Sequence, residues 1–191
     1  VKVLLASDSK IKENAIKKWF KVNLKEIELK LTKSGVSDVL VPPQPMNTGG
    51  VYCCLDRITN IEKGISIIDY DYIISIENSL KVSKEEIADN VNVSIKNCLT
   101  GKIYQESGQD IILNYKILEK YPLFVKVLED LYNSYESTSK KYIYDGCEST
   151  LGSLINRYYT DIPKNNWMKY VCNKDRDCLL YTSPSPRDWM V

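Results

Sequence analysis

Apolar residues recur along the chain with two spacings, and each spacing predicts a different element of secondary structure. Continuous or alternating apolar runs predict strands, at residues 1–6, 27–31, 72–76, 91–95 and 102–105. Apolar residues three or four positions apart predict helices, at residues 10–21, 51–61, 123–132, 151–155 and 167–171. Because strands and helices are mixed along the chain, the sequence predicts an α/β fold.

Polar and turn-forming residues separate these runs. Ser7, Asp8 and Ser9 are N-cap residue types and lie between the first strand and the first helix. The strand at 72–76 is expected to end at Glu77, and residues 97–101 are expected to form a hairpin turn. The polar or proline-containing stretches are expected to be loops, at residues 32–48 and 137–144.

Composition narrows the classes of function. The 26 Lys and Arg residues nearly balance the 25 Asp and Glu residues, which gives a net charge of +1, so we expect no nucleic-acid partner. No apolar run approaches the roughly 18 residues of a membrane span, so we expect a cytoplasmic protein with no membrane partner. The absence of histidine excludes His-based catalytic triads and His-ligated zinc. The six cysteines form no CxxC motif and are expected to be reduced thiols.

The chain length of 191 residues fits one domain. Residues 178–188 read CLLYTSPSPRD, which resembles the in-frame translation of a sequencing-library adapter. The alternative for this segment is a disordered tail rich in proline and serine. We expect residues 1–177 to form the domain and residues 178–191 to be a non-native tail.

The turn between the first strand and the first helix is a candidate for phosphate binding. A helix N-terminus presents unpaired backbone N–H groups and a partial positive charge. The hydroxyls of Ser7 and Ser9 could hold phosphate oxygens there, and Lys12 could neutralise them. The alternative, which the local chemistry alone favours, is ordinary helix capping with a solvated lysine.

A carboxylate at the end of an apolar strand is a candidate metal ligand. Glu77 follows the strand at 72–76, and Asp71 and Asp89 lie near it in the sequence. Ligands of α/β sheets bind at the carboxyl ends of strands, and Mg²⁺ takes one or two carboxylates together with substrate phosphates. The alternative is an ordinary acidic residue in a turn with Asn78 and Ser79.

The paired glycines Gly49 and Gly50 precede the second predicted helix. Glycine allows the backbone to approach a ligand closely. The alternative, which we favour on the local sequence, is a simple junction between a loop and a helix. Cys53 and Cys54 follow on this helix and are expected to be small core residues.

Several short motifs, taken in order, resemble the inosine/xanthosine triphosphatase family of house-cleaning enzymes. Residues 7–12 resemble the family's Thr/Ser-x-Asn-x-x-Lys, with Ser9 in place of Asn, and residues 77–79 resemble its Glu-x-Gly, with Ser79 in place of Gly. Arg57 matches the arginine of the family's next helix, whereas Asn47 stands where the family has Glu. The further similar segments are Ser34-Gly35-Val36, Gln44-Pro45 and Thr150-Leu151-Gly152.

The resemblance implies an elongated mixed β-sheet flanked by helices, with two lobes and a central cleft, in a homodimer. It implies hydrolysis of the nucleoside triphosphates ITP and XTP with Mg²⁺, or with Mn²⁺ as an alternative. Glu77 and Lys12 would be catalytic, and Glu77 would hold the metal, with Asp71 or Asp89 expected as a second contact. The residues expected to bind the substrate are Ser7, Ser9, Lys12, Gly49, Gly50 and Arg57.

Two other functions stay open at this point. One is a pyrophosphatase that acts on other modified nucleotides with the same fold. The other is a nucleotide-binding module without catalysis, which the departures at Ser9, Asn47 and Ser79 suggest. The sequence also does not decide between release of phosphate and release of pyrophosphate.

Overall fold

The computed structural model describes residues 1–23, 26–33, 40–83, 87–108, 110–113 and 115–173. The motif at 34–36 and the expected tail at 178–191 lie outside these ranges. The strands are β1 (Lys2–Leu5), β2 (Glu28–Leu31), β3 (Gln44–Pro45), β4 (Tyr72–Val82), β5 (Ile87–Asn97), β6 (Ile103–Ser107), β7 (Ile111–Leu113) and β8 (Gly146–Cys147). The helices are α1 (Lys10–Asn23), α2 (Gly49–Gly64), α3 (Tyr115–Lys120), α4 (Phe124–Thr138), α5 (Leu151–Tyr158) and α6 (Trp167–Cys172), with a 3-10 helix η1 at Ser139–Lys141.

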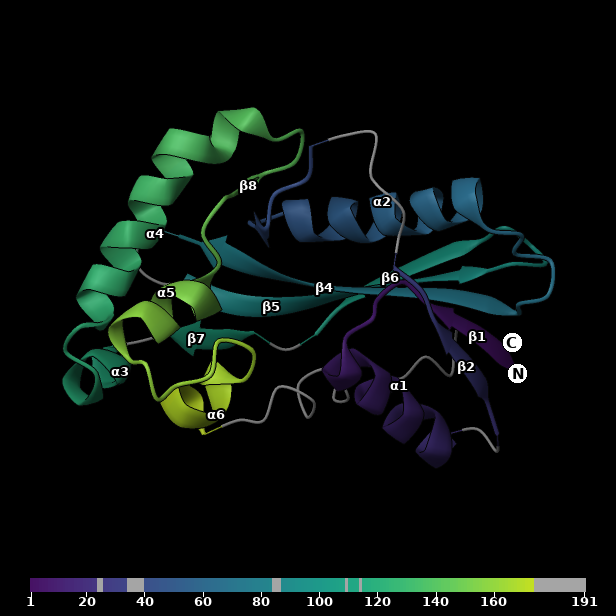
Figure 1. Ribbon diagram of the computed structural model, residues 1–191, viewed down its shortest axis with the longest axis horizontal. Helices are drawn as coiled ribbons and strands as arrows, with labels where there is room; N and C mark the ends of the chain where they lie inside the picture. The colour runs from purple at the N-terminus through teal and green to yellow at the C-terminus, as the bar shows by residue number, and fades with distance from the viewer. Residues whose placement is uncertain (24–25, 34–39, 84–86, 109, 114, 174–191) are drawn as a thin grey trace.

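A mixed sheet runs through the centre of the protein (Figure 1). Its strand order is β2-β1-β4-β5-β6, and β6 and β7 pair with successive stretches of β5. β1 is parallel to both β2 and β4, whereas the pairs made by β5 are antiparallel. β3 and β8 form a separate two-stranded sheet. The predicted α/β class, with a mixed sheet flanked by helices, is confirmed.

Helices cover both faces of this sheet (Figure 1). Successive residues of a strand point to opposite faces. Ile73 of β4 accordingly packs with Ile58 and Ile61 of α2, whereas the next residue, Ile74, packs with Phe20 of α1. Each such side chain, when fully buried, stabilises the fold by roughly 1.5–3 kcal/mol. α2 therefore lies on one face and α1 on the other.

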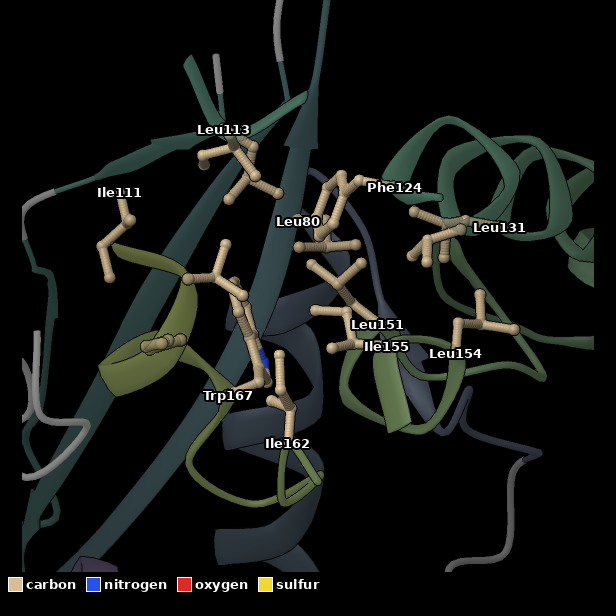
Figure 2. Packing of buried hydrophobic residues seen from close by; sticks show 14 of the residues in the cluster. Leu80, Ile111, Leu113, Phe124, Leu131, Leu151, Leu154, Ile155, Ile162 and Trp167 are labelled. Carbon is tan, nitrogen blue, oxygen red and sulfur yellow. The ribbon is translucent and has the colours of Figure 1, made fainter. Parts of the chain in front are cut away.

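The far end of the sheet packs against a second group of helices (Figure 2). Leu80 of β4 and Leu113 of β7 join a cluster with Phe124 of α4, Leu151 of α5 and Trp167 of α6. Leu80 is an even number of residues from Ile74 and so points to the same face of the sheet. This second core therefore continues along the face that α1 covers at the other end.

β4 is longer than the sequence predicts. The prediction that the strand ends at Glu77 is wrong, because β4 continues to Val82 and pairs with β5 along its whole length. Polar residues in this stretch hydrogen-bond inside the sheet: Asn92 Nδ2 donates to Ser79 Oγ at 2.8 Å, and Ser107 Oγ donates to Asn92 Oδ1 at 3.1 Å. Glu77 therefore lies in the middle of a strand.

Other elements also differ from the sequence expectations. β3 lies inside the expected loop at 32–48, and the sequence pattern did not reveal β7 and α3. α4 extends to Thr138, into the expected loop at 137–144. The hydroxyls of Ser137 and Thr138 donate to carbonyls of the preceding turn, so their polar groups are satisfied inside the helix.

The cysteines of the described residues are all free thiols. Cys53 and Cys54 are buried core residues of α2, as predicted. Burial raises the pKa of each thiol to about 12, so both stay protonated and unreactive at neutral pH. In the described part of the chain, no helix combines the length and the apolar character needed to cross a membrane.

Gly50 packs closely against the sheet, next to residues of β4 and β5. A Cβ added there would lie 2.4 Å from Asn92 Nδ2 and 2.7 Å from Ser79 Cβ. We expect Gly50→Ala to lower the free energy of unfolding by about 1–3 kcal/mol through overpacking, measured by urea denaturation. Gly64→Ala at the end of the same helix is the control, because a Cβ there meets nothing within 4 Å. Equal losses in the two variants would contradict this explanation.

Candidate functional site

The candidate site lies at the carboxyl end of β1, where the strand order reverses. The chain leaves β1 through α1 to β2 on one side, while β4 pairs with β1 on the other side. Open α/β sheets bind ligands at such switch points. β1 pairs with β4 only as far as Ile74, and Met46 next contacts β4 at Leu80. Among the described residues, no strand pairs with residues 75–79 along this edge of β4.

Three charged side chains converge at this open edge. Glu77 Oε2 lies 2.8 Å from Arg57 Nε and 3.5 Å from Lys12 Nζ. Lys12 Nζ also donates to the backbone carbonyl of Ile76 at 2.5 Å. The side chains of Lys12 and Glu77 are each 14% exposed, and that of Arg57 is 35% exposed. We refer to these three residues as the Lys12–Glu77–Arg57 cluster.

Each member of the cluster comes from a different element. Lys12 belongs to the first turn of α1, Arg57 to the middle of α2, and Glu77 to β4. α1 and α2 lie on opposite faces of the sheet, so a paired strand between them would keep their side chains apart. The open edge of β4 is therefore what lets both cations reach one carboxylate.

The cluster keeps its carboxylate ionised. Burial alone raises the pKa of Glu77, but the charges and hydrogen bonds of Lys12 and Arg57 outweigh burial and hold the pKa below its usual value of 4.5. Burial likewise lowers the pKa of Arg57, and Glu77 overcomes this and raises it. All three groups are charged at neutral pH, and two cations with one anion leave a net charge of +1.

A cavity of about 310 Å³ opens beside Glu77. One wall holds the strand residues Glu77, Asn78 and Asp89, and the opposite wall holds residues 150–153 at the start of α5 together with Lys164. Gln44 Oε1 accepts the backbone N–H of Leu151 at 3.1 Å, which ties β3 to the start of α5. A volume near 300 Å³ with polar groups in its walls suits part of a small-molecule ligand.

The carboxylates that line this cavity could hold Mg²⁺ only together with a phosphate ligand. Asp89 is 6% exposed and accepts a hydrogen bond from Asn78 Nδ2 at 2.9 Å. Within the described ranges, no group of three or more His, Cys, Asp or Glu side chains could hold a metal ion. Mg²⁺ usually takes one or two carboxylates and completes its shell with water and substrate phosphates. Asp89 is paired opposite Leu80 and therefore lies on the other face of the sheet from Glu77. The expectation of Asp89 as a second metal contact is thus not supported, and Glu77 is the one carboxylate left to combine with substrate phosphates.

Ser7 and Ser9 lie in the turn between β1 and α1, next to the same strand end. The Ser9 N–H donates to Ser7 Oγ at 3.1 Å, and the Ser9 carbonyl accepts the N–H of Glu13 at 2.9 Å. Ser9 therefore occupies the N-cap position of α1, as the capping alternative expects. The structure thus brings Ser7, Ser9 and Lys12 to one helix N-terminus.

Three residues expected at the site lie away from the cluster, which corrects their predicted placement. Asp71 precedes Glu77 by six residues, about 20 Å along an extended strand, and its carboxylate accepts a backbone N–H at 2.7 Å. Gly49 and Gly50 face protein atoms instead of the cavity. A Cβ on Gly49 would lie 2.1 Å from the carbonyl oxygen of Asp145. The glycines therefore allow close packing of α2.

The cavity also contains residues that the sequence did not point to as site residues. Gln44 and Thr150 belong to short motifs that were visible in the sequence, so those motifs were a usable signal. Lys164 lies between α5 and α6 and belongs to no motif. Its backbone is brought in by Gly152, where an added Cβ would lie 2.2 Å from the Lys164 carbonyl oxygen.

Comparison with other proteins shows the fold and leaves the family unassigned. No protein-family model matches the chain. No curated protein matches it either. The crystal structure of protein VC0702 from Vibrio cholerae superposes with a TM-score of 0.61 and 16% sequence identity, over 94% of this chain and 88% of that one. At this identity the similarity is one of fold alone.

Glu77→Gln tests the ion cluster by its dependence on pH. We expect this variant to lose about 1–3 kcal/mol of unfolding free energy at pH 7, since Lys12 and Arg57 lose their anionic partner. This is less than for a fully buried pair, because Arg57 is 35% exposed. Because the folded pKa lies below the usual 4.5, the stabilisation is complete above roughly pH 5 and is lost as the pH falls through the folded pKa.

Urea denaturation of both proteins between pH 7 and pH 3 measures this effect. The two unfolding free energies are expected to converge as Glu77 becomes protonated in the unmodified protein. A gap of constant size across the whole range would rule out the ion cluster as its cause.

Proposed function

We propose that the protein is a Mg²⁺-dependent hydrolase of the non-standard purine nucleoside triphosphates ITP and XTP, with an inosine-triphosphatase-like cleft between two lobes. The observation that carries this proposal is the Lys12–Glu77–Arg57 cluster at the carboxyl end of β1, beside a cavity of about 310 Å³. Hydrolysis of a triphosphate needs cations for the phosphates, carboxylates for a metal and space for the nucleotide. The cluster offers two cations and one carboxylate beside a cavity that suits part of the nucleotide, and the motifs that resemble those of the inosine/xanthosine triphosphatase family support the substrate class.

Lys12 and Arg57 are suited to neutralising phosphate oxygens. Arginine presents a planar set of donors that matches phosphate, and lysine adds a compact charge. The turn of Ser7 and Ser9 places the N-terminus of α1, with its partial positive charge, at the same strand end. These groups would hold the triphosphate in position while a water oxygen attacks phosphorus. The bond from phosphorus to the leaving phosphate or pyrophosphate oxygen breaks, and the proton of the water passes to a phosphate oxygen.

Glu77 is suited to holding a cation and unsuited to accepting a proton. A general base works best when its pKa lies near the working pH, whereas Lys12 and Arg57 hold the pKa of Glu77 below 4.5. Glu77 would hold Mg²⁺ together with the phosphate oxygens of the substrate. A bound Mg²⁺ neutralises phosphate charge and makes phosphorus more open to attack.

Phosphate and pyrophosphate release from ITP, XTP, GTP, ATP and dTTP tests the proposal, with Mg²⁺ and with EDTA. We expect turnover of ITP and XTP that needs the metal. Glu77→Gln is expected to lower kcat about 100-fold or more, as for the loss of other groups that stabilise transition-state charge. The released product distinguishes a phosphatase from a pyrophosphatase.

Glu62→Gln is the matched control. Glu62 of α2 pairs with Lys96 of β5. The variant therefore makes the same Glu-to-Gln change in an ion pair outside the cluster. Its turnover is expected to equal that of the unmodified protein. Preference for dTTP would favour the pyrophosphatase alternative, and binding of ITP without any turnover would refute hydrolysis and leave a nucleotide-binding module.

A further inference from the structure

The charges of the Lys12–Glu77–Arg57 cluster sum to a positive value. Lys12 and Arg57 contribute two positive charges and Glu77 one negative charge, so the three residues together carry +1. A divalent cation that arrives alone is repelled by this charge, whereas an anion is attracted to it. A pyrophosphate or triphosphate group carries several negative charges and reverses the sign of the site once it is bound.

Glu77 is engaged by cations in the structure. Its Oε2 atom lies 2.8 Å from Arg57 and 3.5 Å from Lys12. A metal ion on this carboxylate has to displace the guanidinium and then lies near two positive charges. Both effects are unfavourable where Glu77 is only 14% exposed, because water screens charges weakly there. Glu77 therefore becomes a good metal ligand only after its present partners have moved to another anion.

Both partners of Glu77 are side chains that bind phosphate well. Arginine bonds phosphate with two parallel N–H donors, and lysine binds it as a point charge. Arg57 is the most accessible member of the cluster at 35% exposed, against 14% for Lys12 and Glu77. An incoming phosphate group therefore meets Arg57 first.

We propose that a polyphosphate group binds the Lys12–Glu77–Arg57 cluster before any metal, draws Arg57 and Lys12 away from Glu77, and so makes the Glu77 carboxylate available to Mg²⁺. This inference rests on the proposed function and adds an order of binding to it. The anion and the cation then raise each other's affinity, by the same factor in both directions. Such coupling factors are typically about 5–150.

Sodium pyrophosphate and MgCl₂, applied singly and together to the full 191-residue chain, test this order. In EDTA, pyrophosphate is expected to bind in calorimetric titrations and to raise Tm by about 5–10 °C at a hundred times its Kd. Sodium sulfate at equal ionic strength controls for general salt stabilisation. Mg²⁺ alone is expected to give no shift in Tm. Its affinity is expected to rise about tenfold or more with pyrophosphate present, after correction for their association in solution.

Variants of the cluster separate the two halves of the proposal. Arg57→Gln is expected to weaken pyrophosphate binding in EDTA about 10–100-fold, and to let Mg²⁺ bind alone, because Glu77 has lost a competing partner. Lys12→Gln is likewise expected to weaken pyrophosphate binding and to let Mg²⁺ bind without the anion. Glu77→Gln is expected to keep or strengthen pyrophosphate binding and to abolish the coupling. Glu62→Gln is expected to leave pyrophosphate binding, Mg²⁺ binding and the coupling between them unchanged.

The results also separate this order from the proposed hydrolysis. Pyrophosphate binding that requires Mg²⁺, or Mg²⁺ binding of equal affinity with and without the anion, would overturn the order. Binding of pyrophosphate in EDTA, with coupling to Mg²⁺ but without turnover of any nucleotide, would keep the order and reject hydrolysis. Turnover of ITP combined with tight binding of Mg²⁺ alone would support hydrolysis and reject the order of binding.

Discussion

The antiparallel pairing of β4 with β5 is the constraint on which the rest of the structure depends. The two strands pair from Tyr72 opposite Asn97 to Val82 opposite Ile87, and residues of β4 belong to all three apolar clusters. Because successive side chains of β4 point to opposite faces of the sheet, Ile73 packs on α2 and Ile74 on α1, and Leu80 packs on the second group of helices. A shift of register by one residue would turn every one of these side chains to the opposite face. The same register places Glu77 on the α2 side of the open edge.

The open edge of β4 links this framework to the chemistry of the site. A strand paired on both sides would separate the two helical layers, but β1 ends at Leu5 while β4 continues. The gap admits Lys12 from one layer and Arg57 from the other, and both neutralise a carboxylate that is otherwise unfavourable in a sheet. Packing and charge are therefore coupled here, since moving either helix would separate an ion pair.

Part of this arrangement was predictable from the sequence and part was not. The apolar spacing of α1 and α2 gave both helices, and the short motifs pointed to Lys12, Arg57 and Glu77. The continuation of β4 past Glu77 was not predictable, because Asn78 and Ser79 are typical turn residues and are satisfied here by bonds to residues of β5, which are distant in the sequence. Asp71 lies away from the cluster because six residues of extended strand separate it from Glu77. Lys164 reaches the cavity through its backbone contact with Gly152 of α5, which the sequence pattern does not reveal.

The hydrogen bond from Lys12 to the Ile76 carbonyl has a consequence for how the protein behaves among other chains. A strand edge with unpaired backbone groups is a template for strands of neighbouring molecules, and natural proteins oppose this with lysine side chains at the edge. Lys12 places its ammonium on that carbonyl at 2.5 Å. The lysine that serves the candidate site therefore also keeps this backbone carbonyl, at a buried residue of β4, from pairing with a strand of a neighbouring molecule.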